Sequence, residues 1–144
     1  MPASPFDLRL PERRTTSVIF ASPHSGRSYP ASFLRSSVLD ERTIRTSEDA
    51  FVDRLLETVP SLGAPLLSAV APRAFIDLNR ASDELDPALV EGVRPVAHNP
   101  RIASGLGVIP RVVAGGMAIY RGKIPREEAD ERIRVWWRSY HDRL

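Results

Sequence analysis

A short apolar run that ends abruptly in a histidine constrains the fold of this chain more than any other stretch. Val18–Ala21 holds four apolar residues in succession and predicts a buried strand, which must end at Pro23 and Gly26. Open α/β sheets bind ligands in the crevice beyond the carboxyl ends of their strands. His24 follows the predicted strand and is therefore the first candidate for chemistry, unless it only caps the strand and bonds a neighbour.

The residues after this loop predict a β-α-β unit. Apolar side chains recur at spacings of three and four over 47–59, which predicts a helix with Ser47 as its N-cap. Strands are predicted at Pro65–Val70 and Phe75–Leu78. A helix between two strands favours parallel pairing. We therefore expect an α/β fold with a mixed, mostly parallel sheet and helices on both faces.

Four further segments surround this unit. Met1–Thr16 is rich in proline and predicts an extended segment that packs across the sheet. Ala81–Gly107 is interrupted by Gly and Pro too often for regular elements, and its His98 is expected to be a solvent-exposed loop residue. Val108–Val113 and Met117–Tyr120 predict a hairpin around a Gly-Gly turn.

The last segment predicts the longest helix. Pro125 suits its first position, and Glu128–Arg132 and Asp130–Arg134 are favourable ion pairs four residues apart. One face carries an apolar stripe that another element must cover, formed by Ala129, Ile133, Trp136, Tyr140 and Leu144. The length of 144 residues suits one domain and is short for two, so we expect residues 1–144 to form a single α/β domain. Because the helix reaches Leu144 without a C-cap glycine, we further expect this domain to be the amino-terminal part of a longer one, with a sheet incomplete at the carboxyl end.

Composition excludes several classes of protein. Of the 144 residues, 42% are hydrophobic, and no run approaches the ~18 apolar residues of a membrane helix, so we expect no membrane partner. The first residues lack the basic start and apolar centre of a secretory signal, which favours the cytoplasm. There is no Cys, so any metal must be bound by His, Asp, Glu or water. The net charge is only +2 and acids interrupt the arginines, so we expect no nucleic acid partner.

Charged and amide side chains gather at the ends of the predicted elements. His24 follows one strand, Asn79 and Arg80 follow another, and Arg73 precedes it. Glu48 falls in the first turn of the predicted helix, where the helix dipole stabilises a carboxylate by about 0.3–1 kcal/mol even without a ligand. His and Glu can share a zinc ion, although a catalytic zinc normally has three protein ligands. The guanidinium fork of Arg beside Asn is suited to binding a carboxylate.

Two other features of the sequence concern the neighbours of these residues. Asp77 within a strand is costly unless it pairs with Arg73 or Arg80. A serine nucleophile is disfavoured, because Ser22 and Ser25 are close sequence neighbours of the histidine and the chain has no Gly-x-Ser-x-Gly elbow.

Several separate motifs, in order and spacing, carry a family resemblance. They are Ser22–Gly26 (Ser-Pro-His-Ser-Gly), Ser47–Asp49 (Ser-Glu-Asp), Val52-Asp53, Ala71–Arg80 and Leu85–Pro87. With these motifs the chain resembles the N-formylglutamate amidohydrolase family over nearly its whole length. The resemblance implies a fold related to that of the zinc carboxypeptidases.

The resemblance also implies an activity and its residues. It indicates a Zn²⁺-dependent hydrolase that cleaves N-formyl-L-glutamate, or a related N-acyl amino acid, to formate and L-glutamate in histidine breakdown. His24 matches the family's first zinc-binding histidine, and Glu48 matches the acidic ligand. Asn79 and Arg80 match the pair expected to bind a substrate carboxylate, and Arg73 the arginine that stabilises the oxyanion or a second carboxylate. The zinc ion would lower the pKa of its bound water toward 7 and polarise the formyl carbonyl.

The chain departs from the family pattern in one respect. The third zinc ligand belongs to an Asp-x-His-Ser segment and the general base is a later glutamate, and neither occurs before Leu144. His141 matches a different, helical histidine of the family. We therefore expect residues 1–144 to have weak activity or none. The alternative is a catalytically silent domain that binds a carboxylate or peptide through Arg73 and Arg80, and nothing in the sequence predicts the oligomeric state.

Overall fold

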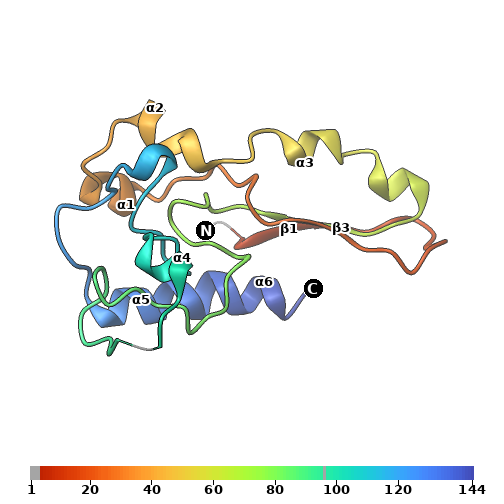
Figure 1. Ribbon diagram of the computed structural model, residues 1–144. Helices are drawn as coiled ribbons and strands as arrows, with labels where there is room; N and C mark the ends of the chain where they lie inside the picture. The colour runs from red at the N-terminus through yellow and green to blue at the C-terminus, as the bar shows by residue number, and fades with distance from the viewer. Residues whose placement is uncertain (1–3, 96) are drawn as a thin grey trace.

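The computed structural model describes residues 4–95 and 97–144 and is built around a small sheet (Figure 1). Its strands are β1 (Phe6–Arg9), β2 (Phe20–Ser22) and β3 (Leu66–Ala69), in the spatial order β1-β3-β2. All four residues of β3 are buried. A near-continuous apolar run is typical of such a central strand, and the strand predicted at 65–70 is confirmed.

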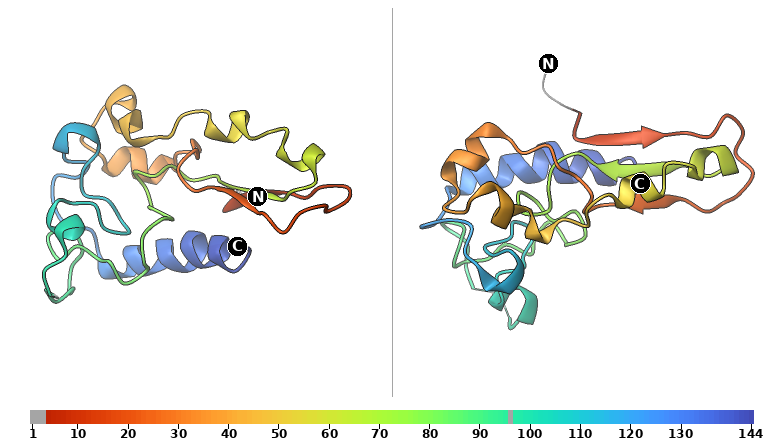
Figure 2. Two further views of the ribbon diagram at one scale, coloured as in Figure 1. Left: turned by 45° about the vertical axis from the view of Figure 1, so that its right-hand side comes forward. Right: turned by 90° about the horizontal axis from the view of Figure 1, so that it is seen from above.

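The sheet is mixed, as expected, but parallel pairs do not predominate. β2 runs parallel to β3, whereas β1 runs antiparallel to it. The segment expected to lie extended across the sheet instead contributes β1 as a strand of the sheet itself. Helices lie around this sheet in an α/β arrangement (Figure 2), and the expected cover of both faces by helices stays a prediction.

The strand that precedes His24 is present, but the prediction of its burial is wrong. β2 begins at Phe20, and Val18 and Ile19 before it are 52% and 44% exposed. The reason is position, because β2 lies at the edge of the sheet and β3 takes the central place.

A series of short helical segments, rather than one long helix, connects β2 to β3. The helix predicted over 47–59 is wrong, because Phe51 has a φ of 65°, in the left-handed region that interrupts any α-helix. Ser47 ends a 3₁₀ turn and does not cap a helix. The parallel crossover from β2 to β3 is nevertheless confirmed. Its segments are α1 (Ala31–Ser36), α2 (Glu41–Ile44), η1 (Arg45–Ser47), α3 (Val52–Leu55) and η2 (Val59–Leu62).

After β3 the chain turns at once, so the strand predicted at Phe75–Leu78 is wrong. The N–H groups of Phe75 and Ile76 both donate to the carbonyl oxygen of Pro72, at 2.9 and 3.3 Å. These hydrogen bonds within the turn take the place of the bonds to a neighbouring strand that a β-strand would make. The turn still buries this segment, and Asp77 within it is only 1% exposed.

The next segments are largely irregular, as expected, and their residue 96 lies outside the described residues, as do residues 1–3 of the lead-in segment. One short helix, α4 (Pro100–Ala103), is capped by the side chain of Asn99. The predicted hairpin reverses at η3 (Ala114–Gly116), but a single antiparallel bridge between Val112 and Ala118 replaces its strands.

The long carboxyl-terminal helix is confirmed. It runs through α5 (Arg126–Arg132), a π-helical segment, η4 (Ile133–Arg138), and α6 (Ser139–His141), with Pro125 at the N-cap rather than the first position. Glu128 pairs with Arg132 as predicted. The predicted ion pair between Asp130 and Arg134 is wrong, because Asp130 pairs with Arg126 and Arg134 pairs with Glu131. Of the predicted stripe, Ala129, Ile133 and Tyr140 are buried, Trp136 is partly buried, and Leu144 is 55% exposed.

The helix joins the main hydrophobic core through a buried arginine. Arg132 is 3% exposed, and its guanidinium carbon lies 4.2 Å from the ring centroid of Phe75. Its Nη1 donates to the Phe75 carbonyl oxygen at 3.0 Å and to the Tyr120 hydroxyl at 2.8 Å. Arg132 thereby ties the helix to two irregular segments. None of the described helices has the length and apolar character that crossing a bilayer requires.

Candidate active site

The loop that carries His24 packs directly on the chain leaving β3. A Cβ at Gly26 would overlap the carbonyl of Ala71, so only glycine permits this approach. The N–H of Ser28 donates to the Val70 carbonyl oxygen at 3.0 Å. Because β2 and β3 are parallel, their carboxyl ends meet at one edge of the sheet, and the loops that follow them bring His24 next to Asp77.

Asp77 is the centre of the site. Its Oδ1 lies 2.7 Å from His24 Nε2 and accepts the backbone N–H of Asn79 at 2.9 Å. Its Oδ2 accepts from Arg73 Nε at 3.0 Å and lies 3.9 Å from Arg80 Nε. Both arginines predicted as partners of Asp77 therefore lie beside it.

These contacts set the charge of Asp77 and the tautomer of His24. Burial by itself would raise the pKa of Asp77, but the hydrogen bond from His24 and the positive charge of Arg73 outweigh it and lower the pKa below its usual value. An ionised carboxylate can only accept, so Nε2 of His24 carries the proton. The other ring nitrogen, Nδ1, faces away from Asp77 and carries the free lone pair whenever the ring is neutral.

Asp49, not Glu48, is the acid that faces this lone pair. Asp49 Oδ2 lies 3.4 Å from His24 Nδ1, and the Asp49 N–H donates to the His24 carbonyl oxygen at 3.0 Å. Asp49 is also half-exposed, with 55% of its side chain accessible, so it is open to a ligand.

The Glu48 carboxylate is already bound to other side chains. The hydroxyl of Tyr29 donates to its Oε1 at 2.6 Å, and Arg45 pairs with it at 3.2 Å. Burial, together with the hydrogen bond to Glu48, raises the pKa of Tyr29, which keeps that hydroxyl a donor. The side chain of Glu48 is 4% exposed, and its contacts are those of a structural ion pair.

A cavity of about 410 Å³ opens beside these residues. It is lined by Thr46–Asp49 and Arg73, together with residues between Ser104 and Gly116. Arg73 uses Nε for Asp77, which leaves its two terminal amino groups for a ligand. Glu48, Asp49 and Arg73 therefore share one cavity.

The other predicted site residues differ in how they are placed. Arg80 is partly buried, and its Nε has no hydrogen-bond partner within residues 4–95 and 97–144. Asn79 is exposed and takes part through its backbone N–H only. Ser22 Oγ donates to Ser25 Oγ at 2.7 Å, and among the described residues neither hydroxyl bonds His24, as expected for a site without a serine nucleophile.

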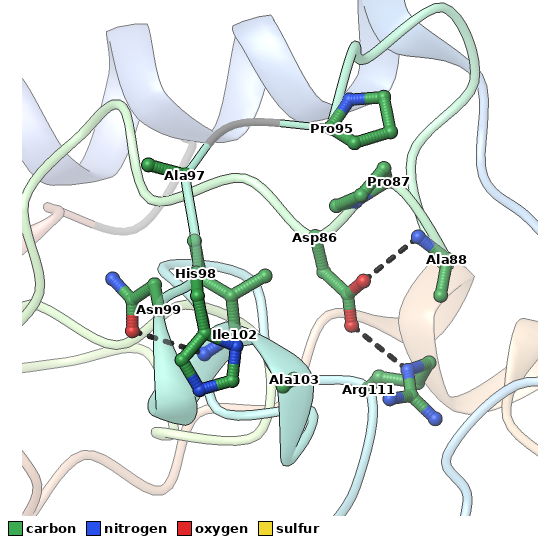
Figure 3. Close-up of a pocket in the computed structure, with 10 residues that line it drawn as sticks. All are labelled: Asp86, Pro87, Ala88, Pro95, Ala97, His98, Asn99, Ile102, Ala103 and Arg111. Carbon is green, nitrogen blue, oxygen red and sulfur yellow. Dashed lines mark hydrogen bonds and ion pairs between the residues drawn. The ribbon is translucent and has the colours of Figure 1, made fainter.

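A second cavity, of about 290 Å³, is lined in part by residues of α4 and the loop before it (Figure 3). Asp86 and Arg111 form an ion pair of 2.8 Å on one side of it, with His98 and Asn99 on the other (Figure 3). His98 is exposed, as expected. None of the residues predicted for chemistry lines this cavity.

The donor set fits part of a zinc site. In the neutral tautomer, the Nδ1 lone pair of His24 faces a carboxylate oxygen across 3.4 Å, an arrangement that is stable with a proton or a cation between the two. Ligand atoms of a tetrahedral zinc ion, each about 2.0–2.1 Å from the metal, lie about 3.3 Å from one another. His24 and Asp49 thus match two ligands. No group of three or more His, Cys, Asp or Glu suited to one ion occurs in the part of the chain that the structure describes. Asp77 is not a third ligand beside Asp49, because it contacts the opposite ring nitrogen of His24.

The sequence analysis did not single out Asp49 as a neighbour of His24, and it considered Asp77 only as a partner of Arg73 or Arg80. Asp49 belongs to the Ser47–Asp49 motif, but the helix predicted over this segment placed Glu48 and Asp49 together in its first turn. Asp77 carried a usable signal, because a carboxylate among buried apolar residues requires partners. Its partner His24 lies 53 residues away in sequence, which no spacing rule reveals.

Comparison with known proteins places the chain in a family. A sequence model of the N-formylglutamate amidohydrolase family matches residues 16–144. The N-formylglutamate deformylase of Pseudomonas aeruginosa is 29% identical over 135 residues, covering 90% of this chain and 44% of that protein. The crystal structure of N-formylglutamate amidohydrolase from Ralstonia eutropha JMP134 is 40% identical with a TM-score of 0.89, covering 99% of this chain and 51% of that chain. The chain thus spans about half the length of these relatives. The match over residues 16–144 shows that it belongs to the N-formylglutamate amidohydrolase family.

Proposed function

We propose that the site around His24 is that of a zinc amidohydrolase acting on N-formyl-L-glutamate, or a related N-acyl amino acid, in histidine breakdown. The observation that carries the proposal is the His24 Nδ1–Asp49 Oδ2 pair at 3.4 Å, beside the cavity that Arg73 lines. Family membership and the names of the two relatives support the substrate class. The products would be formate and L-glutamate.

In this proposal, His24 and Asp49 hold the zinc ion. When bound, the ion would lower the pKa of a water molecule and polarise the formyl carbonyl. Asp77 fixes the ring orientation and tautomer of His24, because its carboxylate accepts the Nε2 proton and so directs Nδ1 outward. Asp49 replaces Glu48 as the proposed acidic ligand, since Glu48 is saturated by Tyr29 and Arg45.

The arginines act on the charges of the substrate. Arg73 is held by Asp77 at Nε and directs its remaining donors to a developing oxyanion or a carboxylate in the cavity. Arg80, with Asn79, is proposed to bind the other carboxylate, because its buried Nε has no hydrogen-bond partner in the described part of the chain. Two arginines match the two carboxylates of N-formyl-L-glutamate.

Zinc affinity of two matched variants tests this assignment. We expect Asp49→Asn to weaken Zn²⁺ binding at least about tenfold, which is about 1.4 kcal/mol, in a competition titration against a zinc-binding dye. Glu48→Gln keeps an acceptor for Tyr29 and should retain the affinity. Loss in Glu48→Gln with retention in Asp49→Asn would assign the ligand to Glu48 instead.

A second function is favoured by a specific observation. Among the described residues no group of three or more His, Cys, Asp or Glu could hold a metal ion, while Arg73 and Arg80 both lie beside Asp77. This function is binding of a carboxylate ligand without turnover. We expect calorimetry and a formate assay to separate the two. Zinc-dependent formate release from N-formyl-L-glutamate, even if slow, supports the amidohydrolase, whereas binding of the same compound without zinc and without formate supports the silent domain.

A further inference from the structure

Phe51 has a backbone conformation that its side chain does not favour. Its φ is 65°, and among residues 4–95 and 97–144 every other residue with a positive φ is a glycine. A bulky side chain in this left-handed region costs free energy, because its Cβ crowds the following carbonyl oxygen. Such strain persists only where the surroundings hold it, and it collects at functional sites. Phe51 comes shortly after Asp49, whose carboxylate faces His24, so the contacts that hold Phe51 also act on Asp49.

The side chain of Arg27 holds this segment in two ways. Its Nη1 and Nη2 atoms donate to Oδ1 and Oδ2 of Asp53, both at 3.0 Å. Its guanidinium carbon lies 5.5 Å from the ring centroid of Phe51, within the roughly 6 Å of a cation–π contact. Because Phe51 is 60% exposed, the contact with Arg27, rather than burial in the core, explains a phenyl ring where glycine would be unstrained. We call Arg27, Asp53 and Phe51 together the Arg27 clamp.

The clamp joins the two segments that carry the proposed zinc ligands. Arg27 belongs to the loop of His24, and its Nη1 also donates to the Ser25 carbonyl oxygen at 3.3 Å. Asp53 belongs to the segment of Asp49, and the N–H of Asp49 donates to the His24 carbonyl oxygen at 3.0 Å. A single backbone bond lets one segment pivot about the other, whereas a second anchor at Asp53 opposes that rotation. The clamp therefore bears on where the Asp49 carboxylate points.

We propose that Arg27 is a positioning residue for zinc binding, which fixes the Asp49 carboxylate opposite His24 Nδ1 by binding Asp53 and packing on Phe51. The part of this inference that concerns zinc rests on the proposed function. Arg27 does not line the cavity beside Asp49, so it acts through the backbone rather than on a ligand. Its charge alone would repel a zinc ion. The planar fork of its guanidinium makes the contribution, because it forms two parallel bonds to a carboxylate and stacks on a ring, which an ammonium group cannot do.

The test replaces Arg27 by lysine, which keeps the charge and loses the fork. The first measurement needs no metal and follows amide hydrogen exchange by NMR in protein treated with a chelator. We expect Arg27→Lys to speed exchange of the Asp49 N–H at least about tenfold, because the segment opens locally. The N–H of Asp77, which donates to the Val108 carbonyl oxygen at 2.8 Å, should keep its rate, since the clamp does not contact it.

The second measurement is a competition titration with zinc alone against a zinc-binding dye. We expect Arg27→Lys to weaken zinc binding about tenfold, the lower end of what loss of a residue that orients a metal ligand costs. Arg54→Lys is the matched control, because Arg54 is exposed and directly follows Asp53. It makes the same substitution outside the clamp and should change neither measurement.

A further pair of variants tests the ring of Phe51 while leaving Arg27 and Asp53 intact. Phe51→Tyr keeps an aromatic face for the guanidinium, and Phe51→Leu removes it, although both variants keep a Cβ at the same φ. We expect Phe51→Leu to speed exchange of the Asp49 N–H about two- to fivefold relative to Phe51→Tyr, as loss of an exposed cation–π contact does.

The outcomes separate this proposal from the proposed function. The role of Arg27 is overturned if Arg27→Lys leaves exchange of the Asp49 N–H unchanged, if the Asp77 N–H accelerates as much, or if zinc affinity is retained despite faster exchange. Equal exchange in Phe51→Leu and Phe51→Tyr overturns it as well. If the unaltered chain binds no zinc, the proposed function fails, and exchange of the Asp49 N–H then decides by itself whether Arg27 positions this segment.

Discussion

The charge of a buried residue in this site depends on its hydrogen-bond and ion-pair partners. Asp77 accepts hydrogen bonds from the Nε2–H of His24 and the Nε–H of Arg73, and Arg80 lies at ion-pair distance. Burial makes the ionised carboxylate costly in free energy, and the side chains of His24, Arg73 and Arg80 offset this cost. A neutral residue at position 77 would leave these side chains without a charged partner in a site that water does not reach.

Asp77→Asn is therefore expected to lower the free energy of unfolding by about 3 kcal/mol, the usual cost of breaking a buried ion pair from one side. Urea denaturation followed by circular dichroism measures it. Asp83→Asn is the control, because Asp83 is exposed and its change should stay within about 0.5 kcal/mol. Equal stability of the Asp77 variant and the unaltered chain would contradict the role given to Asp77.

At the scale of elements, the His24 loop and the chain after β3 are held together by close backbone contact. Gly26 allows that contact because any Cβ would overlap the Ala71 carbonyl. The carboxyl-terminal helix is held differently, through Arg132 and two buried tyrosines. One of these, Tyr120, accepts from Arg132 at 2.8 Å, whereas the hydroxyl of Tyr140 has no partner among the described residues.

Gly26→Ala should destabilise the fold by about 1–3 kcal/mol, because overpacking moves the loop or the backbone after β3. Gly122→Ala is a matched control, since an added methyl group there meets nothing within 4 Å. Thermal unfolding of both variants measures the difference. The close packing of loop and strand would be contradicted if the two variants melted together.

Loss of the hydroxyl should change the free energy of unfolding in opposite directions at Tyr140 and Tyr120. Burial raises the pKa of Tyr140 to about 12, so its O–H remains protonated and unpaired, and Tyr140→Phe should raise the free energy of unfolding by about 1 kcal/mol. Tyr120→Phe removes an acceptor from buried Arg132 and should lower the free energy of unfolding by about 1–3 kcal/mol. Chemical denaturation of both variants checks the sign, and a loss of stability in Tyr140→Phe would indicate a partner for its hydroxyl.

At the scale of the whole molecule, carboxylates paired with arginine govern the response to acid. The hydrogen bond from Arg27, 3.0 Å at both oxygens, and its charge lower the pKa of Asp53. A carboxyl whose folded pKa lies below its unfolded value, about 3.9, stabilises the fold at pH values above that value. This contribution is lost as the pH falls through the folded pKa.

We therefore expect the stability advantage of the unaltered chain over Asp53→Asn to be full near neutral pH, above the unfolded pKa, and to be lost as the pH falls through the lower folded pKa. Urea denaturation across this range measures it. Asp142→Asn, at an exposed position near the end of the chain, should give a pH dependence like that of the unaltered chain. A difference in the free energy of unfolding between the unaltered chain and Asp53→Asn that is the same at all pH values would contradict a stabilising contribution from the charge of Asp53.

The sequence by itself determined the features that depend on neighbouring residues. The helix from Pro125, the central strand at Leu66–Ala69 and the turn at Ala114–Gly116 each follow from a local apolar period or from turn residues. His24, placed just after a strand, and Arg73 beside Asp77 were also predictable, because residues four apart or at the end of a run are related by local geometry.

Only the tertiary structure decided what depends on distant contacts. Phe51 adopts a φ of 65° and its ring lies 5.5 Å from the guanidinium of Arg27, so a helix-like apolar period broke into short turns. The edge position of β2, the placement of Asp49 Oδ2 opposite His24 Nδ1 and the His24–Asp77 hydrogen bond likewise arise from segments far apart in the chain. The physical reason is that periodicity reports which side of an element is apolar, whereas the partners that neutralise a buried charge are fixed only when the folded backbone brings them together.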